Sequence, residues 1–543
     1  MRKILLSIVL IIISQFLLGQ EVITNEKIQF GTPHPVVDAN SKSYYKHKDL
    51  ILGIKVKKKK KGDIYTLQTY NSNKLSLEKV KVYDDFPTSL SRESIITLND
   101  RIFIFFSGWN KQKEVEQLFV REIDVENASF KGDLKLISEV DGELSGVSSG
   151  KFMNFNVFEK YSFYPSFDES KLLIKYRLYP EKKNDSKNKD VIGYKVFNEN
   201  IELLHGSEVE MPYTEKKMEN LDYTVDNSGR FYIAAKVYRD NSTKQNATNK
   251  QDGTKEINYD IEVMTISVNG DLTQKKIILE SGKHINSLIL FESGTGEIIS
   301  TGYYSSGGKK GYSLSDADGV FKFNLTTADD NFKINYYDIP LEIINQNKKK
   351  REVEKKKKKE EKKEGGASLS NLNPVRFFVH SDGSIVLIGE QSFVTTHTYS
   401  TSEGKTRTVT TYHYDDVLIT KINNDGSLAY MKKMAKRQVN ELSSFELIEG
   451  KDDLYLVYLD DIKNLDLNLV DVPYRAGEFL TAYKINYETG ETSKISLFDY
   501  RIVKKQKIYQ FSLSRIITTA DDEFVFEVYK KKKEDLLIKV NLK

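Results

Sequence analysis

The feature that most constrains the fold is a strand–turn–strand unit that recurs eight times along the chain. Each unit has an apolar or aromatic run, a polar turn rich in Asp, Gly, Ser or Asn, and a second apolar run, as in DYTVDNSGRFYIAAKVY. β-Branched and aromatic residues favour strands, and the turn residues end them. The eight first turns are expected near residues 48, 99, 168, 228, 295, 382, 451 and 521.

Most units are followed by a second hairpin whose first arm alternates between apolar and polar residues. Its turn contains Asn269-Gly270, Asp425-Gly426 or Thr489-Gly490 in three of the units. Asn-Gly and Asp-Gly pairs are strong hairpin signals, and we expect both turn residues to have positive φ. The repeating unit is therefore four antiparallel strands, denoted a, b, c and d.

Repeated four-stranded units predict an all-β fold, a β-propeller of about eight antiparallel blades, with seven blades as the alternative. The last unit, from Ser514 to Lys543, has strands a, b and c but no strand d. The segment EKIQF (Glu26 to Phe30) can supply it, so we expect an N-terminal strand to close the ring. A pair of stacked β-sandwiches is the other architecture that these strands could form.

One unit carries a family resemblance. The segment YPSFDESKLLIKY resembles one blade of the WD-like repeats of periplasmic propeller proteins, through Pro165, Phe167, Asp168 and Lys171. More broadly, the chain resembles uncharacterised secreted β-propeller proteins of Gram-negative envelopes. The resemblance implies the fold and an exported location, and it implies no reaction.

The N-terminus predicts export. Residues 1–19 have a basic start, Arg2 and Lys3, followed by an apolar run and Gly19, which is typical of a signal peptide. Residues 20–543 are then expected to form a single propeller domain, periplasmic, outer-envelope-associated or extracellular. No later apolar run approaches the ~18 residues of a spanning helix, so no transmembrane helix is expected after cleavage. The chain has no Cys, which excludes disulfides and thiolate chemistry.

The excess of positive over negative charge lies in one insert. The net charge is +4, but residues 348–366 alone contain eleven cationic and five anionic side chains, so the remainder is slightly acidic. Such a balance gives no global field toward nucleic acid, and no specific nucleic-acid partner is expected. On composition, we predict a disordered Lys/Glu-rich insert at about 346–368, with Lys355 and Lys357 as candidate electrostatic contacts.

The topology predicts which face binds. In a four-stranded meander, the a–b and c–d turns lie at one end, and the b–c and d–a connections lie at the other. The long inserts all fall in this second class: 180–189, 239–257, 305–319, 394–414 and 460–478 as b–c loops, and the Lys/Glu-rich insert as a d–a crossover. Because binding residues gather on loops carried by a rigid scaffold, we expect this face to engage a partner. Tolerated insertion without function is the alternative.

One Tyr-rich hairpin on that face supplies the other candidate binding residues: His397, Tyr399, Arg407 and Tyr412. His397 and His413 also raise the question of a metal. With a two-residue turn at Glu403-Gly404, His397 pairs across from Thr410, and His413 then points to the opposite face. No metal site and no cofactor are therefore predicted.

Catalytic motifs are weak. The string GVSSG fits G-x-S-x-G, but it lacks the preceding buried strand and the following helix that a nucleophile elbow needs. No catalytic residue is assigned.

We therefore expect a secreted, non-catalytic binding or scaffold propeller that engages a protein or an envelope polymer through its loop-rich face. The alternative is a polysaccharide-active hydrolase or lyase with carboxylates in the central funnel. Two buried carboxylates with a Tyr or His at the funnel mouth would favour the enzyme, and an apolar funnel would favour binding. The oligomeric state is left open.

Overall fold

The computed structural model describes most of the chain. The described residues are 21–22, 27–60, 62–146, 159–180, 187–240, 244–248, 255–306, 315–325, 333–346, 354, 368–400, 406–439, 445–460, 479–499, 502–503, 506–530 and 533–543. The predicted signal peptide and nearly all of the predicted Lys/Glu-rich insert lie outside the described residues.

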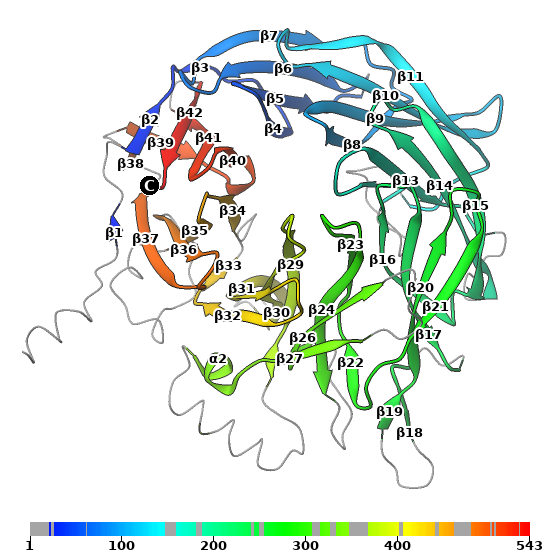
Figure 1. The fold of residues 1–543 in the computed structure, drawn as a ribbon. Helices are drawn as coiled ribbons and strands as arrows, with labels where there is room; N and C mark the ends of the chain where they lie inside the picture. The colour runs from blue at the N-terminus through cyan, green and yellow to red at the C-terminus, as the bar shows by residue number, and fades with distance from the viewer. Residues whose placement is uncertain are drawn as a thin grey trace, which may run out of the picture.

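The strands form eight antiparallel blades arranged in a ring (Figure 1). Blade 1 contains β4 (Ser41–His47), β5 (Leu50–Lys57), β6 (Ile64–Asn71) and β7 (Leu77–Tyr83). Blade 2 contains β8 (Ser91–Leu98), β9 (Arg101–Asn110), β10 (Val115–Asp124) and β11 (Ser129–Asp141). Blade 3 contains β12 (Tyr161–Pro165), β13 (Lys171–Arg177), β14 (Lys189–Asn198) and β15 (Leu203–Thr214). Blade 4 contains β16 (Met218–Val225), β17 (Phe231–Tyr238), β20 (Tyr259–Ile266) and β21 (Leu272–Ile277).

The second half of the ring follows the same order with more irregular inner strands. Blade 5 contains the split strand β22 (Lys283–Ile285) and β23 (Ile289–Glu292), then β24 (Ile298–Ser306), β26 (Gly319–Leu325) and β27 (Asn335–Asp338). Blade 6 contains β29 (Leu372–Val379), β30 (Ile385–Ser400), β31 (Thr406–Ile422) and β32 (Leu428–Met434). Blade 7 contains β34 (Glu446–Glu449), β35 (Asp453–Asp460), β36 (Phe479–Asn486) and β37 (Thr492–Asp499). Blade 8 contains β40 (Ile517–Ala520), β41 (Glu523–Lys530) and β42 (Glu534–Asn541).

The prediction of about eight blades is confirmed, and the seven-bladed and sandwich alternatives are wrong. Each of the eight predicted first turns falls between strands a and b of a blade. These turns were predictable because each hairpin is specified by local sequence: apolar runs flank a short polar segment.

The ring closes through the N-terminus, as predicted. Strand β2 (Ile28–Phe30) pairs antiparallel with β42, where Ile28 lies opposite Val540. The short β3 (His34–Pro35) continues along the same strand. In Figure 1 these N-terminal strands lie beside the C-terminal strand of the chain. The strand missing from the last blade is therefore supplied by residues at the other end of the chain.

The predicted turn geometry is wrong in one respect. At Asn269-Gly270 only the glycine has a positive φ, of 88°. Gly270 N–H donates to the Ser267 carbonyl at 2.9 Å, and Ser267 N–H donates to the Asp271 carbonyl at the same distance. The loop therefore holds three residues and ends in a left-handed glycine, a geometry that requires only one residue of positive φ.

Short accessory elements decorate the ring. They are β1 (Glu21–Val22), which pairs with β37, the pair β18 (Asn246–Thr248) and β19 (Lys255–Ile257), the pair β25 (Asp316–Ala317) and β28 (Leu369–Ser370), β33 (Gln438–Val439), β38 (Ile502–Val503), β39 (Gln506–Gln510), α2 (Leu341–Asn345) and the 3-10 helix η4 (Leu513–Arg515). Within the described ranges, no helix has the length and apolar character to cross a membrane.

The core is divided among the blade interfaces. The described residues form eight buried apolar clusters, and each joins two neighbouring blades. Successive residues of a strand b enter different clusters: Phe105 packs toward blade 3, and Phe106 packs toward blade 1. Because both faces of every blade are covered, these strands have continuous apolar runs rather than strict alternation.

Candidate functional site

The two faces of the ring differ in their connections. Strand order within each blade puts the a–b and c–d turns at one end and the b–c and d–a connections at the other. The long inserts identified from sequence leave strands b or d, so they emerge at the same face, which we call the loop-rich face. We call the opposite face the short-turn face.

A polar cavity of about 460 Å³ opens on the loop-rich face between blades 3 and 4. Strand ends build it: β12 and β16 begin there, β13 ends there, and β14 starts there. We call it the blade 3–4 pocket; its lining residues are Glu159, Lys160, Ser162, Lys175, Tyr176, Arg177, Asp190, Ile192, Glu215, Met218, Glu219, Asn220 and Tyr223. A smaller cavity of about 240 Å³ adjoins it and shares Arg177 and Asp190.

Two of the three cations in the pocket are held in ion pairs. Arg177 Nη2 lies 2.6 Å from Asp190 Oδ1 and 3.0 Å from Glu215 Oε1, so one guanidinium joins strands from blade 3 to the start of blade 4. Lys160 Nζ lies 2.8 Å from the buried Glu116 of blade 2. These cations organise the walls of the pocket and have their charge compensated.

Lys175 differs from both. Among the described residues it has no ion pair, and its Nζ lies 4.0 Å from the centre of the Tyr223 ring. Burial lowers the pKa of Lys175 to about 8, although the carboxylate of Glu159 acts in the opposite direction. Asp190 and Asp222 act in the same direction as Glu159. At neutral pH the ammonium is still mainly charged, so it offers a ligand in the pocket a positive charge that is not held in an ion pair with any described residue.

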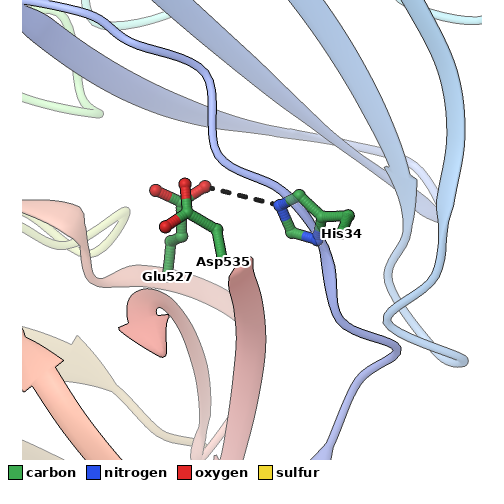
Figure 2. Close-up of side chains that lie close together, drawn as sticks. All are labelled: His34, Glu527 and Asp535. Atoms are coloured by element: carbon green, nitrogen blue, oxygen red, sulfur yellow. Dashed lines mark ion pairs between the residues drawn. The ribbon is translucent and has the colours of Figure 1, made fainter. Parts of the chain in front are cut away.

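A second group of titratable side chains lies at the ring closure (Figure 2). His34, Glu527 and Asp535 are buried, and one ligand atom from each lies within 4.8 Å of the others. By residue type alone, these three could hold a metal ion. We call them, together with Lys42 and Lys55, the closure cluster.

The lysines decide against a metal in the closure cluster. Lys42 Nζ lies 2.6 Å from Glu527 and 2.7 Å from Asp535, and Lys55 Nζ lies 2.6 Å from Glu527. Two ammonium groups therefore already occupy the positions beside the carboxylates and balance their charge. Burial by itself would raise the pKa of Glu527. The pKa is nevertheless held well below its usual range by His34, Lys55 and Lys42. The cluster joins blade 8 to blade 1 and has a structural role.

The predicted binding residues lie apart from the blade 3–4 pocket. His397 and Tyr412 are exposed on the long hairpin of β30 and β31, and Tyr399 lies opposite Arg407 in the same hairpin. None of these four lines the pocket. Lys355 and Lys357 lie outside the described residues.

The predicted register of this hairpin is wrong by one residue. His397 pairs with Val409, not with Thr410, because residues 401–405 separate the last pair, Ser400 and Thr406. His397 and His413 therefore project from the same side of the hairpin, contrary to the expectation. They are still four residue positions apart, roughly 13 Å, and His413 Nε2 is 2.8 Å from Thr395 Oγ1. Their separation, rather than opposite orientation, argues against a shared metal.

Sequence reasoning missed Lys175 and Arg177. The available signal was the pair Lys175 and Arg177 at the end of an apolar run in strand b, within KLLIKYRLY. The sequence of this segment indicates a blade strand but not a cavity, because the cavity is formed together with the first residues of the next blade.

Comparison with known proteins finds remote likenesses to solved structures. No family model and no curated protein matches the chain. Polysaccharide lyase Uly1 is similar over 92% of this chain and 90% of that one, with a TM-score of 0.38 and 9% identity. The β-propeller domain of the trilobed protease from Pyrococcus furiosus covers 84% of this chain and 94% of its own, with a TM-score of 0.32 and 12% identity. The likeness to Penicillium chrysogenum α-L-arabinanase covers 66% of this chain and 94% of that one, with a TM-score of 0.30 and 9% identity.

Proposed function

We propose that this chain is an exported, non-catalytic binding propeller that holds an acidic segment of a partner protein in the blade 3–4 pocket. The observation that carries the proposal is the ammonium of Lys175, which has no ion pair among the described residues, inside a cavity of about 460 Å³ on the loop-rich face. A carboxylate of the partner would pair with Lys175. Glu159 and Glu219 would accept hydrogen bonds from backbone N–H groups of the same segment.

The long hairpin favours a protein over an envelope polymer. It exposes 54% of Val394, 46% of Val409 and 52% of Tyr412, although it projects from a well-packed blade. Exposed apolar and aromatic side chains on a protrusion are typical of protein interfaces. In this proposal His397, Tyr399 and Arg407 contact the same partner, and Lys355 and Lys357 add electrostatic attraction.

The exported location belongs to the same proposal. It is supported by the basic start and apolar run of residues 1–19.

Fluorescence polarisation with defined peptides tests the proposal. A labelled peptide rich in Glu, with a free C-terminal carboxylate, is compared with its amidated Gln counterpart. We expect the acidic peptide to bind about tenfold more tightly, as for one charge-assisted contact. Lys175→Met should remove this preference. Lys216→Met is the matched control, because Lys216 is an exposed lysine nearby that does not line the pocket.

The results of this experiment distinguish a protein partner from an acidic polymer. Equal loss in both lysine variants would mean that the pocket is not the site. Binding of a polygalacturonate oligomer, but of neither peptide, would replace the protein partner with an acidic polymer. No Lys175-dependent binding of either probe would refute the proposal.

One observation favours an enzyme as the second candidate. Asp190 and Glu215 share Arg177 in a pocket that also contains Tyr223, and a lysine with a pKa of about 8 can act as a general base. Cleavage of uronate polymers can be measured by the appearance of new reducing ends. Cleavage by the wild type that is lost in Lys175→Met would support a polysaccharide-active enzyme instead.

A further inference from the structure

A second cavity, of about 310 Å³, lies at the inner edge of the ring near the short-turn face. The ends of the innermost strands of blades 3, 4, 5 and 6 form it. We call it the aromatic box; its lining residues are Phe163, Tyr164, Pro165, Phe167, Asp222, Tyr223, Thr224, Leu290, Phe291, Glu292, Phe377 and Val379. Six of these twelve side chains are aromatic, so the box offers π faces from all four blades.

The aromatic side chains are held in fixed pairs. The rings of Phe291 and Phe377 stack with centres 4.8 Å apart, and those of Tyr164 and Tyr223 are 6.0 Å apart. Phe167 and Phe377 remain 41% and 36% exposed, so the box is open to solvent. It is therefore an accessible cavity rather than part of the sealed core.

Two carboxylates also line the box, and neither has an ion pair among the described residues. Asp222 Oδ2 accepts a hydrogen bond from Leu290 N–H at 2.8 Å. Glu292 accepts from Asn227 N–H at 3.0 Å and from Phe167 N–H at 3.3 Å. These bonds hold the acids in place across blades, and neither acid is neutralised by an ion pair with a described residue.

The neighbouring charges strengthen this imbalance. Burial raises the pKa of Asp222 to about 6, and burial likewise raises the pKa of Glu292, beside Asp226 and Asp168. Two cations lie near these acids. Arg230 is paired with Asp226 at 2.7 Å, and Lys175, over the Tyr223 ring, lowers the pKa of Asp222 but forms no ion pair with it.

We propose that the aromatic box binds a small organic ammonium group, methylated or primary. Aromatic faces attract such cations through the ring quadrupole, and the two carboxylates supply the opposite charge. A volume of about 310 Å³ suits a small ligand or the end of one side chain. Tyr223 lines both this box and the blade 3–4 pocket. The inference goes beyond the proposed function, because Asp222, Glu292 and Phe377 have no part in that function.

Calorimetric titration of the full chain tests the charge requirement. Choline is compared with 3,3-dimethylbutanol, its uncharged analogue of the same shape. We expect choline to bind about tenfold more tightly, since a plain apolar cavity would not discriminate between them. A short peptide carrying trimethyl-lysine tests the same chemistry on a protein side chain, and tighter binding of the peptide would identify a side chain as the source.

Variants test the residues. Asp222→Asn keeps an acceptor for Leu290 N–H but removes the charge, and it should weaken choline binding about tenfold. Asp271→Asn, an exposed acid in a short turn of the same blade, should leave binding unchanged. Phe377→Leu keeps apolar volume at the mouth and removes an aromatic face, so it should also weaken choline binding even if Asp222→Asn folds poorly.

Equal affinity for choline and dimethylbutanol would overturn the proposal, as would the absence of choline and peptide binding at millimolar concentration in the folded wild-type protein. Unchanged choline binding in a folded Phe377→Leu or Asp222→Asn variant would place the ligand elsewhere. Lys175→Met should not weaken choline binding, which separates failure here from failure of the proposed function.

Discussion

Lys175 is a residue whose burial as a charged group opposes stability. Its ammonium is half-buried beside an aromatic ring and has no ion pair among the described residues. The charges that face it come from its own strand and from three neighbouring segments: Arg177, Glu159, Asp190 and Asp222. A charge held in this way costs folding free energy, which a bound carboxylate would return.

Lys175→Met is therefore expected to stabilise the protein by on the order of 1–3 kcal/mol at neutral pH. The folded pKa of about 8 is below the ordinary 10.5, so the unfolded chain binds more protons between these values. Stability of the wild type should accordingly rise as the pH rises from 8 to 10.5, and the gap to the variant should close. Urea denaturation across this range measures both effects. A variant less stable than wild type at neutral pH would contradict the assignment.

Glu527 is the opposite case, because its charge is required. Glu527→Gln leaves Lys42 and Lys55 buried with one remaining carboxylate, and it should destabilise the protein by about 3–5 kcal/mol. Since the pKa of Glu527 is held well below its ordinary 4.5, the stabilisation is present above that pH and is lost as the pH falls below it. Glu523→Gln, which breaks a partly exposed pair with Lys539, is the control and should cost under about 1 kcal/mol. Equal effects of the two variants in urea denaturation would exclude the proposed role.

These residue-scale properties could not be predicted from the sequence. Lys175 and Arg177 stand out as charges in an apolar strand, but their partners come from β14 and from the first residues of blade 4. Glu527 and Lys55 are separated by 472 positions, so their contact depends on ring closure.

At the scale of elements, the N-terminal strand is the piece that completes the fold. Among the described residues, the apolar cluster between blades 8 and 1 has six buried members, fewer than the other seven interfaces. The closure cluster and strands β2 and β3 supplement this thin core. Ile28 is 3% exposed and packs in the neighbouring cluster with blades 7 and 8.

A chain starting at residue 36 should consequently be much less stable than one starting at residue 27. It loses β2, β3 and His34, and burial of one large apolar side chain alone contributes about 1.5–3 kcal/mol. It also exposes the edge of β42, which favours pairing with another copy. Thermal unfolding measures the loss, size-exclusion chromatography detects the pairing, and a synthetic peptide spanning residues 24–36 should restore the monomer. Indistinguishable melting of the two chains would show that closure by this strand is dispensable.

Some features of the strands and turns are specified by the nearby sequence, and others are not. The positions of the eight first turns were predictable, since Gly, Asn and Asp between apolar runs end strands wherever they occur. The register of β30 with β31 was not, because the sequence does not fix whether two or five residues form the loop, and one residue changes which side chains share a face.

At the scale of the whole molecule, ring closure gives the two faces different chemistry. The loop-rich face has a pocket lined mainly by charged and polar residues, and the short-turn face has a box lined by six aromatic residues and two carboxylates. Blade number followed from counting repeats, but both cavities require strands from two to four blades to converge, which no local pattern specifies.

Hydrogen–deuterium exchange with the acidic peptide at saturation tests the central claim most directly. We predict slower exchange at residues 159–163, 175–179, 190–192 and 215–220, which surround the blade 3–4 pocket, and no such protection in Lys175→Met. The a–b turns of the short-turn face should be unaffected. Protection confined to those turns, or the same protection in Lys175→Met, would contradict the assignment of the loop-rich face as the partner-binding surface.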